Sequence, residues 1–135
     1  MKVHIDFCEE QHFKARARNF KDIEMDEPKS FHGSNLGPSP VEYLLIGIGG
    51  CLGSTLSFCM RKNELEIEDL NLSVDGVLKH TGPNNYLRLK KIICDVHCSV
   101  KGPEDLKEKC FNEFKKYCIV TNSLGIPTEI NIKNE

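Results

Sequence analysis

The chain carries no charged side chain between Glu42 and Arg61, so a long segment in its first half has no group that demands water. Ser39, Pro40 and Glu42 form a helix start just before it. Serine is a good cap, proline fits the first helical position, and the Ser-x-x-Glu spacing completes a capping box. We therefore predict a long, buried central helix that starts at Pro40.

The predicted helix is rich in glycine, at Gly47, Gly49, Gly50 and Gly53. Each glycine costs a helix about 1 kcal/mol relative to alanine, so we expect another helix or a sheet to pack closely against the backbone and compensate. Cys51 lies among these glycines, where a thiol is either an unreactive core residue or a nucleophile protected from water. A transmembrane span is the alternative. The high content of glycine, serine and threonine disfavours it, as does the lone span it would make among amphipathic strands.

Length and charge exclude several classes of protein. The 135 residues suit a single domain, and 18 basic against 20 acidic side chains leave a net charge of −2. No broad basic field exists for nucleic acid. Residues 1–13 alternate instead of forming the apolar core of a signal peptide, so we expect a cytoplasmic protein that does not bind membranes. Seven cysteines are an odd number, which argues for reduced thiols, and a disulfide would then more readily be functional than structural.

Alternating apolar and polar residues predict strands on both sides of the helix. Three short strands are expected before it, and two longer strands, a second helix, a short helical turn and a last strand after it. The segments are 3–7, 13–17, 21–25, 70–76 and 92–100 for the first five strands, 104–114 for the second helix and 126–132 for the last strand. This order implies an α+β fold with the long helix on an antiparallel sheet. The helix has more apolar surface than one small sheet covers, so we expect a homodimer.

The predicted strand 92–100 offers a tempting metal site. Cys94 and Cys98 lie close to His97 in the sequence, yet the alternation of a strand turns His97 to the opposite face. The other ligands of a zinc site have no clear spacing elsewhere, so we predict core cysteines and no metal. Three further cysteines have no diagnostic neighbours and are expected to be buried apolar residues or bystander thiols: Cys8, Cys59 and Cys110.

Cys118 begins a second cysteine motif, in which Thr121 replaces the second cysteine of a redox Cys-x-x-Cys. If a short helix starts here, its N-terminal dipole would favour the thiolate of Cys118. From these residues alone, a buried cysteine without reactivity is an equal alternative.

Two segments together resemble the paired cysteine motifs of the OsmC/Ohr family, the osmotically inducible protein C and organic hydroperoxide resistance proteins. The first is Gly-Pro-Ser-Pro-Val-Glu-Tyr-Leu-Leu at residues 37–45 with Gly-Gly-Cys at 49–51. The second is Tyr-Cys-Ile-Val-Thr-Asn-Ser-Leu at residues 117–124. The order of the predicted elements and the spacing between the motifs are also similar, so the resemblance covers nearly the whole chain. It is closer to the less characterised OsmC-like branches.

The resemblance implies an intertwined homodimer with a thiol-dependent peroxidase site at the subunit interface and no cofactor. Cys51 would be the thiolate that attacks an organic hydroperoxide, and Cys118 the resolving thiol that closes a disulfide. A dithiol reductant, of the lipoyl type in this family, would reopen it. Because Cys51 lies inside a helix, we expect a cation to activate it, and Arg16 or Arg18 would correspond to the family's N-terminal arginine.

Two positions depart from the family pattern. Val41 stands where typical hydroperoxide resistance proteins have a glutamate that pairs with the arginine, and Ile119 replaces a proline that often follows the second cysteine. Glu42 is one residue later, about 100° round the helix, where it supports the site or serves only as the cap. Two other classes therefore stay open. One is a different cysteine enzyme for sulfur or acyl transfer, and the other a non-catalytic dimer that binds an apolar ligand.

Overall fold

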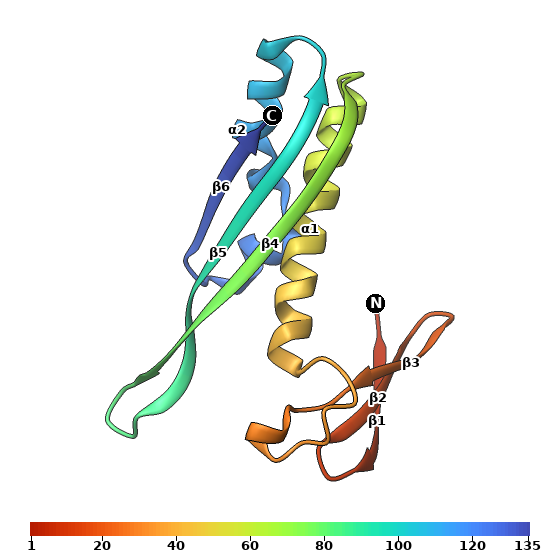
Figure 1. Cartoon of the computed structure of the whole chain (residues 1–135), viewed down its shortest axis with the longest axis vertical. Helices are drawn as coiled ribbons and strands as arrows, with labels where there is room; N and C mark the ends of the chain where they lie inside the picture. The colour runs from red at the N-terminus through yellow and green to blue at the C-terminus, as the bar shows by residue number, and fades with distance from the viewer. The chain divides into compact units, whose positions relative to one another are not determined.

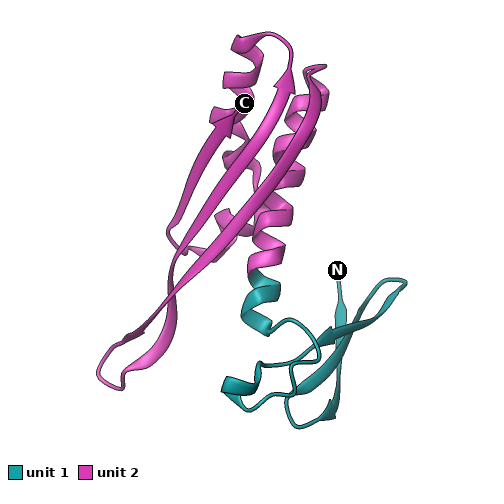
Figure 2. Cartoon of the chain, in the orientation of Figure 1, with its two compact units in different colours: residues 1–44 teal, residues 45–135 magenta.

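An antiparallel meander forms the first of the two units into which the chain divides, residues 1–44 (Figure 2). The computed structural model describes all residues from 1 to 135. In the first unit, β1 (Val3–Glu9), β2 (His12–Ala17) and β3 (Phe20–Met25) pair in chain order. The three short strands and their first hairpin were predicted from the sequence, and the structure confirms them.

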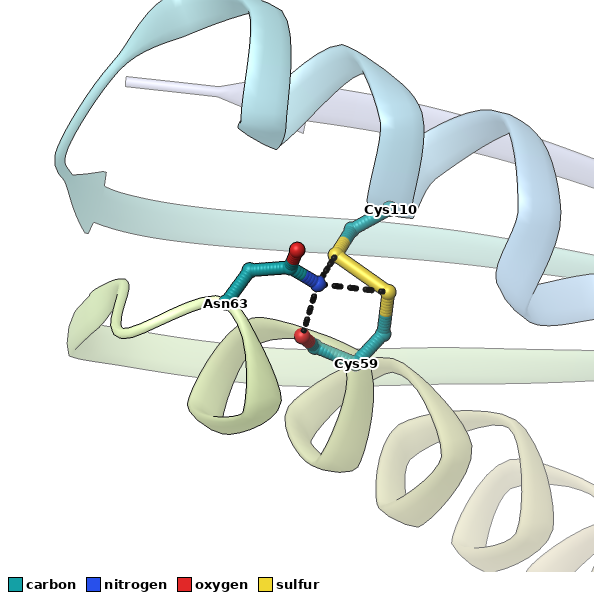
Figure 3. Close-up of a disulfide and its surroundings, with 3 residues drawn as sticks. All are labelled: Cys59, Asn63 and Cys110. Carbon is teal, nitrogen blue, oxygen red and sulfur yellow. Dashed lines mark hydrogen bonds between the residues drawn. A yellow bond between two sulfur atoms is a disulfide. The ribbon is translucent and has the colours of Figure 1, made fainter.

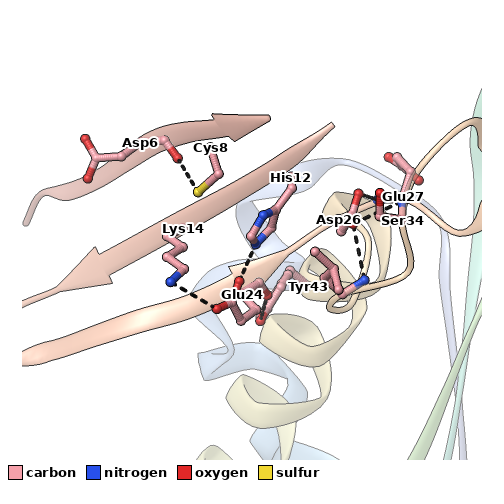
Figure 4. A network of polar contacts seen from close by, with 10 residues as sticks. Asp6, Cys8, His12, Lys14, Glu24, Asp26, Glu27, Ser34 and Tyr43 are labelled. Atoms are coloured by element: carbon pink, nitrogen blue, oxygen red, sulfur yellow. Dashed lines mark hydrogen bonds and ion pairs between the residues drawn. The ribbon is translucent and has the colours of Figure 1, made fainter. Parts of the chain in front are cut away.

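A buried carboxylate organises the loop that follows β3. Asp26 is 1% exposed, and its side chain accepts hydrogen bonds from the backbone N–H groups of Glu27 at 2.8 Å and Ser34 at 3.1 Å (Figure 4). The N–H group of Leu36 donates a third, at 3.2 Å. These bonds satisfy backbone groups that have no partner in a helix or sheet, so the loop is ordered by one side chain. It contains one short 3-10 helix, η1 (Lys29–Phe31).

The long helix α1 (Pro40–Lys62) begins with the predicted capping box. The backbone N–H of Ser39 donates to Glu42 Oε2 at 2.6 Å, and the N–H of Glu42 donates to Ser39 Oγ at 3.2 Å. Both ends of the capping motif are therefore satisfied, and the prediction that the helix starts at Pro40 is confirmed.

The second unit, residues 45–135, is a three-stranded sheet with helices packed on it (Figure 1). After α1, its elements are β4 (Glu66–Thr81), β5 (Tyr86–Lys101), α2 (Glu104–Tyr117), α3 (Ile119–Leu124) and β6 (Thr128–Asn134). β4 and β5 form a long antiparallel hairpin, whereas β6 joins β5 in parallel. The α+β class is confirmed, and the parallel pair is an addition. The crossover through α2 and α3 provides the length that a parallel connection needs.

The core of the second unit lies between one face of β5 and one stripe of each long helix. Every second residue of β5 from Ile92 to Val100 is buried, while His97 between them lies on the opposite face, as predicted. α1 contributes four residues that are 0% exposed: Ile48, Leu52, Leu56 and Met60. Only 22% of the most apolar part of α1 is buried within the single chain, which agrees with the expectation that the helix has more apolar surface than one small sheet covers. The sheet covers one stripe.

Two of the four glycines of α1 explain its close packing against β4. A Cβ at Gly49 would come within 2.9 Å of Val74, and one at Gly53 within 3.1 Å of Leu72. The prediction of close approach is confirmed there and wrong at Gly47 and Gly50, which face open space. By length and composition α1 is also able to cross a membrane, a test that the core helix of a soluble protein passes equally well.

Candidate functional site

The second unit brings together Cys51 of α1 and Cys118, which lies between α2 and α3. Cys51 is half-buried, Cys118 is 0% exposed, and their side chains hydrogen-bond to each other. Cys118 is the C-cap of α2 and the N-cap of α3, so the corner between these helices sets where its sulfur points. Two thiols that lie far apart in the sequence thus share one site.

Hydrogen-bond donors favour the thiolate of Cys51. Burial opposes ionisation, but the backbone N–H groups of Val120 and Ile119, the Cys118 thiol and the Thr55 hydroxyl outweigh it. The pKa of Cys51 is therefore below its ordinary value. The first N–H groups of α3 therefore contribute to the activation of this cysteine in addition to the cation that we expect.

The environment of Cys118 has the opposite effect. Burial raises the pKa of Cys118, and the neighbouring Cys51 raises it further, although the hydroxyl and N–H of Thr121 lower it in part. The short helix does favour the Cys118 thiolate through Thr121, as expected, but burial and the neighbouring Cys51 outweigh this contribution. The hydroxyl of Thr121 does reach the thiol, as the Cys-x-x-Thr spacing suggested. Of the two thiols, Cys118 is thus the one that keeps its proton to higher pH, which suits it to be the donor of the pair.

The candidate arginines lie in the first unit, on and after β2. Arg16 Nε is 3.8 Å from Asp6 Oδ2, and the Arg18 guanidinium lies 5.0 Å from the centre of the Phe20 ring. Both side chains are exposed and have local partners. Their role at Cys51 stays a prediction.

Glu42, the other supporting candidate, accepts the hydrogen bond of the Ser39 N–H described above. Its carboxylate is thus engaged in capping α1. This contact accounts for the residue without any role in the chemistry.

Two polar residues near the thiols were missed by the sequence reasoning. The Thr55 hydroxyl lies within hydrogen-bond reach of both the carbonyl of Cys51, at 2.7 Å, and its thiol, and its single proton serves one of the two at a time. Asn122 Nδ2 donates to the carbonyl of Cys118 at 2.7 Å, and to those of Lys115 and Lys116 at 3.0 and 3.2 Å. Asn122 thereby ties the end of α2 to α3. A polar residue one turn after each cysteine, at i+4, is the signal that would have found both.

A second cysteine pair corrects the prediction that Cys59 and Cys110 are bystanders. They form a disulfide between α1 and α2, with a Cα–Cα distance of 5.7 Å (Figure 3). The signal was in the spacing. Cys51 and Cys59 are eight residues apart, as are Cys110 and Cys118, so two antiparallel helices can pair them at two levels.

The remaining cysteines of the second unit, Cys94 and Cys98, are buried in the core, and burial raises the pKa of both. No group of three or more His, Cys, Asp or Glu side chains in the chain is arranged to hold a metal. The arrangement of cysteines as a whole is compatible with a redox function.

Comparison with known proteins shows the family of the chain. A family model described as OsmC-like protein matches residues 32–133. No curated protein sequence matches the chain. The structure is similar to an OsmC-like protein from Mycoplasma pneumoniae, with 21% identity, a TM-score of 0.80, and 99% of this chain and 94% of that one covered.

Two further solved structures have the same fold. A hypothetical protein from Aquifex aeolicus VF5 has 20% identity and a TM-score of 0.79, with 99% of this chain and 95% of that one covered. The organic hydroperoxide resistance protein OhrB of Bacillus subtilis has 16% identity and a TM-score of 0.66, with 98% and 96% covered. With the family match over most of the sequence, the conclusion is that the chain belongs to the OsmC-like protein family.

Proposed function

We propose that the chain is a thiol-dependent peroxidase that reduces organic hydroperoxides. The observation that carries the proposal is the opposite pKa change of two hydrogen-bonded thiols, below the ordinary value for Cys51 and above it for Cys118. Attack on a peroxide requires a thiolate, and a resolving thiol that stays protonated does not compete for the oxidant. The asymmetry therefore supports Cys51 as the nucleophile and Cys118 as the resolving cysteine.

The proposed cycle has three steps. The Cys51 thiolate attacks the terminal oxygen of the hydroperoxide, the O–O bond breaks, and the alkoxide leaves and takes a proton to become an alcohol. The Cys118 sulfur then attacks the sulfenic acid of Cys51, and the S–O bond breaks while the Cys118 proton leaves with the oxygen as water. Finally a dithiol reduces the disulfide and is itself oxidised to a disulfide.

We further propose that a second copy of the chain completes the site. On α1, Ile46 is 58% exposed and the neighbouring Gly47 and Gly50 face open space. An apolar and uncharged helix face of this kind supports association. Arg16 and Arg18 remain the proposed cations. A cytoplasmic location would supply the reduced dithiol that the cycle consumes.

The test is oxidation of the reduced protein by one equivalent of cumene hydroperoxide, followed by intact-mass analysis and peptide mapping. Using the Cys59→Ser/Cys110→Ser background leaves one pair to follow. We expect rapid loss of two hydrogens and a Cys51–Cys118 link, with Cys8→Ser as a silent control because Cys8 is exposed in the first unit. An unreacted Cys51, or one oxidised beyond the sulfenic acid without a link, would contradict the peroxidase.

Variants of Cys118 separate the proposal from its alternatives. Cys118→Ser stops dithiol-driven turnover in the proposed cycle, whereas a one-cysteine transferase would keep its activity. Sedimentation at micromolar concentration tests the dimer, and a purely monomeric profile would contradict it.

A further inference from the structure

The Cys59–Cys110 disulfide and the Cys51–Cys118 pair both lie where α1 faces α2, a region that we call the α1–α2 seam. Along each of the two helices the pairs are eight residues apart, which corresponds to about 12 Å of helix length. This distance is too long for direct exchange between the pairs, because exchange requires the sulfur atoms to touch. The second pair therefore needs its own route to a reaction partner.

A cavity of about 330 Å³ is lined by one cysteine of this disulfide and not by the other. Cys59 is half-buried and lines the cavity, whereas Cys110 is 0% exposed and does not. A small molecule in the cavity thus has access to Cys59 alone. Its wall also includes the exposed rings of Phe58 and Tyr117, which suit a short aliphatic ligand.

The charges around the cavity favour an anion. Lys62 and Lys109 line it and are exposed, and neither takes part in an ion pair within the chain. Glu113 is the single carboxylate of the lining, so one positive charge is left over. A small ligand that carries a carboxylate would meet complementary charge there.

Asn63 supports both ends of the disulfide. Its Nδ2 donates to the carbonyl of Cys59 at 2.8 Å and lies 3.7 Å from Cys59 Sγ and 3.6 Å from Cys110 Sγ (Figure 3). A donor held close to Cys110 Sγ stabilises negative charge on that sulfur. Cys110 is therefore suited to leave as a thiolate when Cys59 is attacked.

We propose that the Cys59–Cys110 disulfide is a second, exchangeable redox site, which a small thiol bearing a carboxylate opens from the cavity. The thiolate of that molecule attacks Cys59 Sγ, a new S–S bond forms, and the Cys59–Cys110 bond breaks with Cys110 leaving as a thiolate that takes up a proton. A second thiol then displaces Cys59. Two thiols are oxidised to one disulfide, and the protein disulfide is reduced to two thiols.

The experiment uses the full chain with Cys51→Ser and Cys118→Ser, so that its result does not depend on the proposed peroxidase. Reduction of the remaining disulfide is followed with mercaptopropionate, mercaptoethanol and cysteamine, and each rate constant is corrected for the thiolate fraction. We expect the anionic thiol to react about tenfold faster than the neutral one, and the cationic thiol to be slowest. Acid quenching and mapping should find the mixed disulfide on Cys59.

The charge dependence has a matched control. Lys62→Gln/Lys109→Gln should bring the three rate constants together, whereas Lys79→Gln/Lys90→Gln, which removes two exposed charges outside the cavity, should leave their order unchanged. Both variants change only exposed side chains, so folding is retained. Equal rates for the three thiols, a mixed disulfide on Cys110, or a disulfide that stays closed until the chain unfolds would each overturn the proposal.

Discussion

The two cysteine pairs of the α1–α2 seam have the same residues at matching levels and different chemistry. At the Cys51–Cys118 level, N–H groups of α3 reach one sulfur, and the two thiols differ in the direction of their pKa change. At the Cys59–Cys110 level, one side-chain amide is shared by both sulfurs, which are already joined. Hydrogen-bond donors, and not the cysteines themselves, distinguish the pairs. The donors around each pair therefore determine whether its two sulfurs differ in ionisation, as at Cys51 and Cys118, or share one contact, as at Cys59 and Cys110.

The largest difference between the two pairs is expected in peroxidase turnover when one cysteine of each pair is replaced by serine. Cys51→Ser should reduce dithiol-driven turnover of cumene hydroperoxide to the uncatalysed background, because a serine hydroxyl does not ionise near neutral pH. Cys59→Ser should keep turnover within a factor of about 5, the size of an effect of about 1 kcal/mol. A coupled assay of hydroperoxide consumption measures both. Equal loss in the two variants would show that the pairs act as one.

The stability of the fold should depend on the second pair more than on the first. Cys59→Ser/Cys110→Ser opens a link with a sequence separation of 51 residues, so the free energy of unfolding should fall by about 2–4 kcal/mol. Cys51→Ser/Cys118→Ser breaks no link, and the hydroxyl buried at position 118 has Thr121 as a hydrogen-bond partner, so the loss should be smaller, about 1 kcal/mol. Urea unfolding of both double variants, compared with the parent chain under non-reducing conditions, provides the measurement. Equal losses in the free energy of unfolding for the two double variants would contradict the prediction that stability depends more on the Cys59–Cys110 pair.

One asparagine contacts each cysteine pair. Replacing either by alanine should change the rate at which the disulfide of its own pair opens or closes by about fivefold, which corresponds to about 1 kcal/mol. Asn63→Ala removes the donor near the Cys110 sulfur and should slow reduction of the Cys59–Cys110 link by mercaptoethanol. Asn122→Ala loosens the α2–α3 corner and should slow closure of the Cys51–Cys118 link after oxidation. Peptide mapping over time follows both links. An asparagine variant that slowed both pairs equally would point to a general loss of structure.

The smallest expected effect is a change in the pH dependence of Cys51. Burial opposes its ionisation, and the Thr55 hydroxyl is among the donors that outweigh burial, so Thr55→Val should raise the pKa of Cys51. Iodoacetamide alkylates only the thiolate, so the rate of Cys51 alkylation rises with pH through the pKa of Cys51. The Thr55→Val variant should therefore need a higher pH than the parent chain to reach the same alkylation rate.

Ser54→Ala is the matched control for this titration. The Ser54 hydroxyl donates to the carbonyl of Cys51 at 3.1 Å and is not among the donors to the thiol. The pH profile of iodoacetamide alkylation should therefore stay unchanged. A shift of equal size in both variants would rule out a specific role for Thr55.

Local patterns predicted the parts of the fold that depend on neighbours in sequence. The capping box of Ser39 and Glu42 fixed the start of α1, and the period-two pattern of residues 92–100 separated buried cysteines from His97. The pairing of Cys59 with Cys110 and the orientation of the α3 N–H groups depend on how α1 packs against α2. No local pattern encodes that packing, so the nature of the disulfide and the source of Cys51 activation became clear only in three dimensions.

The buried thiols of β5 offer an intrinsic probe of motion. Cys94 and Cys98 are at most 3% exposed, so a thiol reagent labels them only when the centre of the sheet separates from the helices above it. Their labelling rates at increasing denaturant would give the free energy of that opening without any introduced label. A fast rate at Cys98 and a slow one at Cys94 would reveal fraying from the end of β6, because Cys98 pairs with Asn134 near the end of that strand.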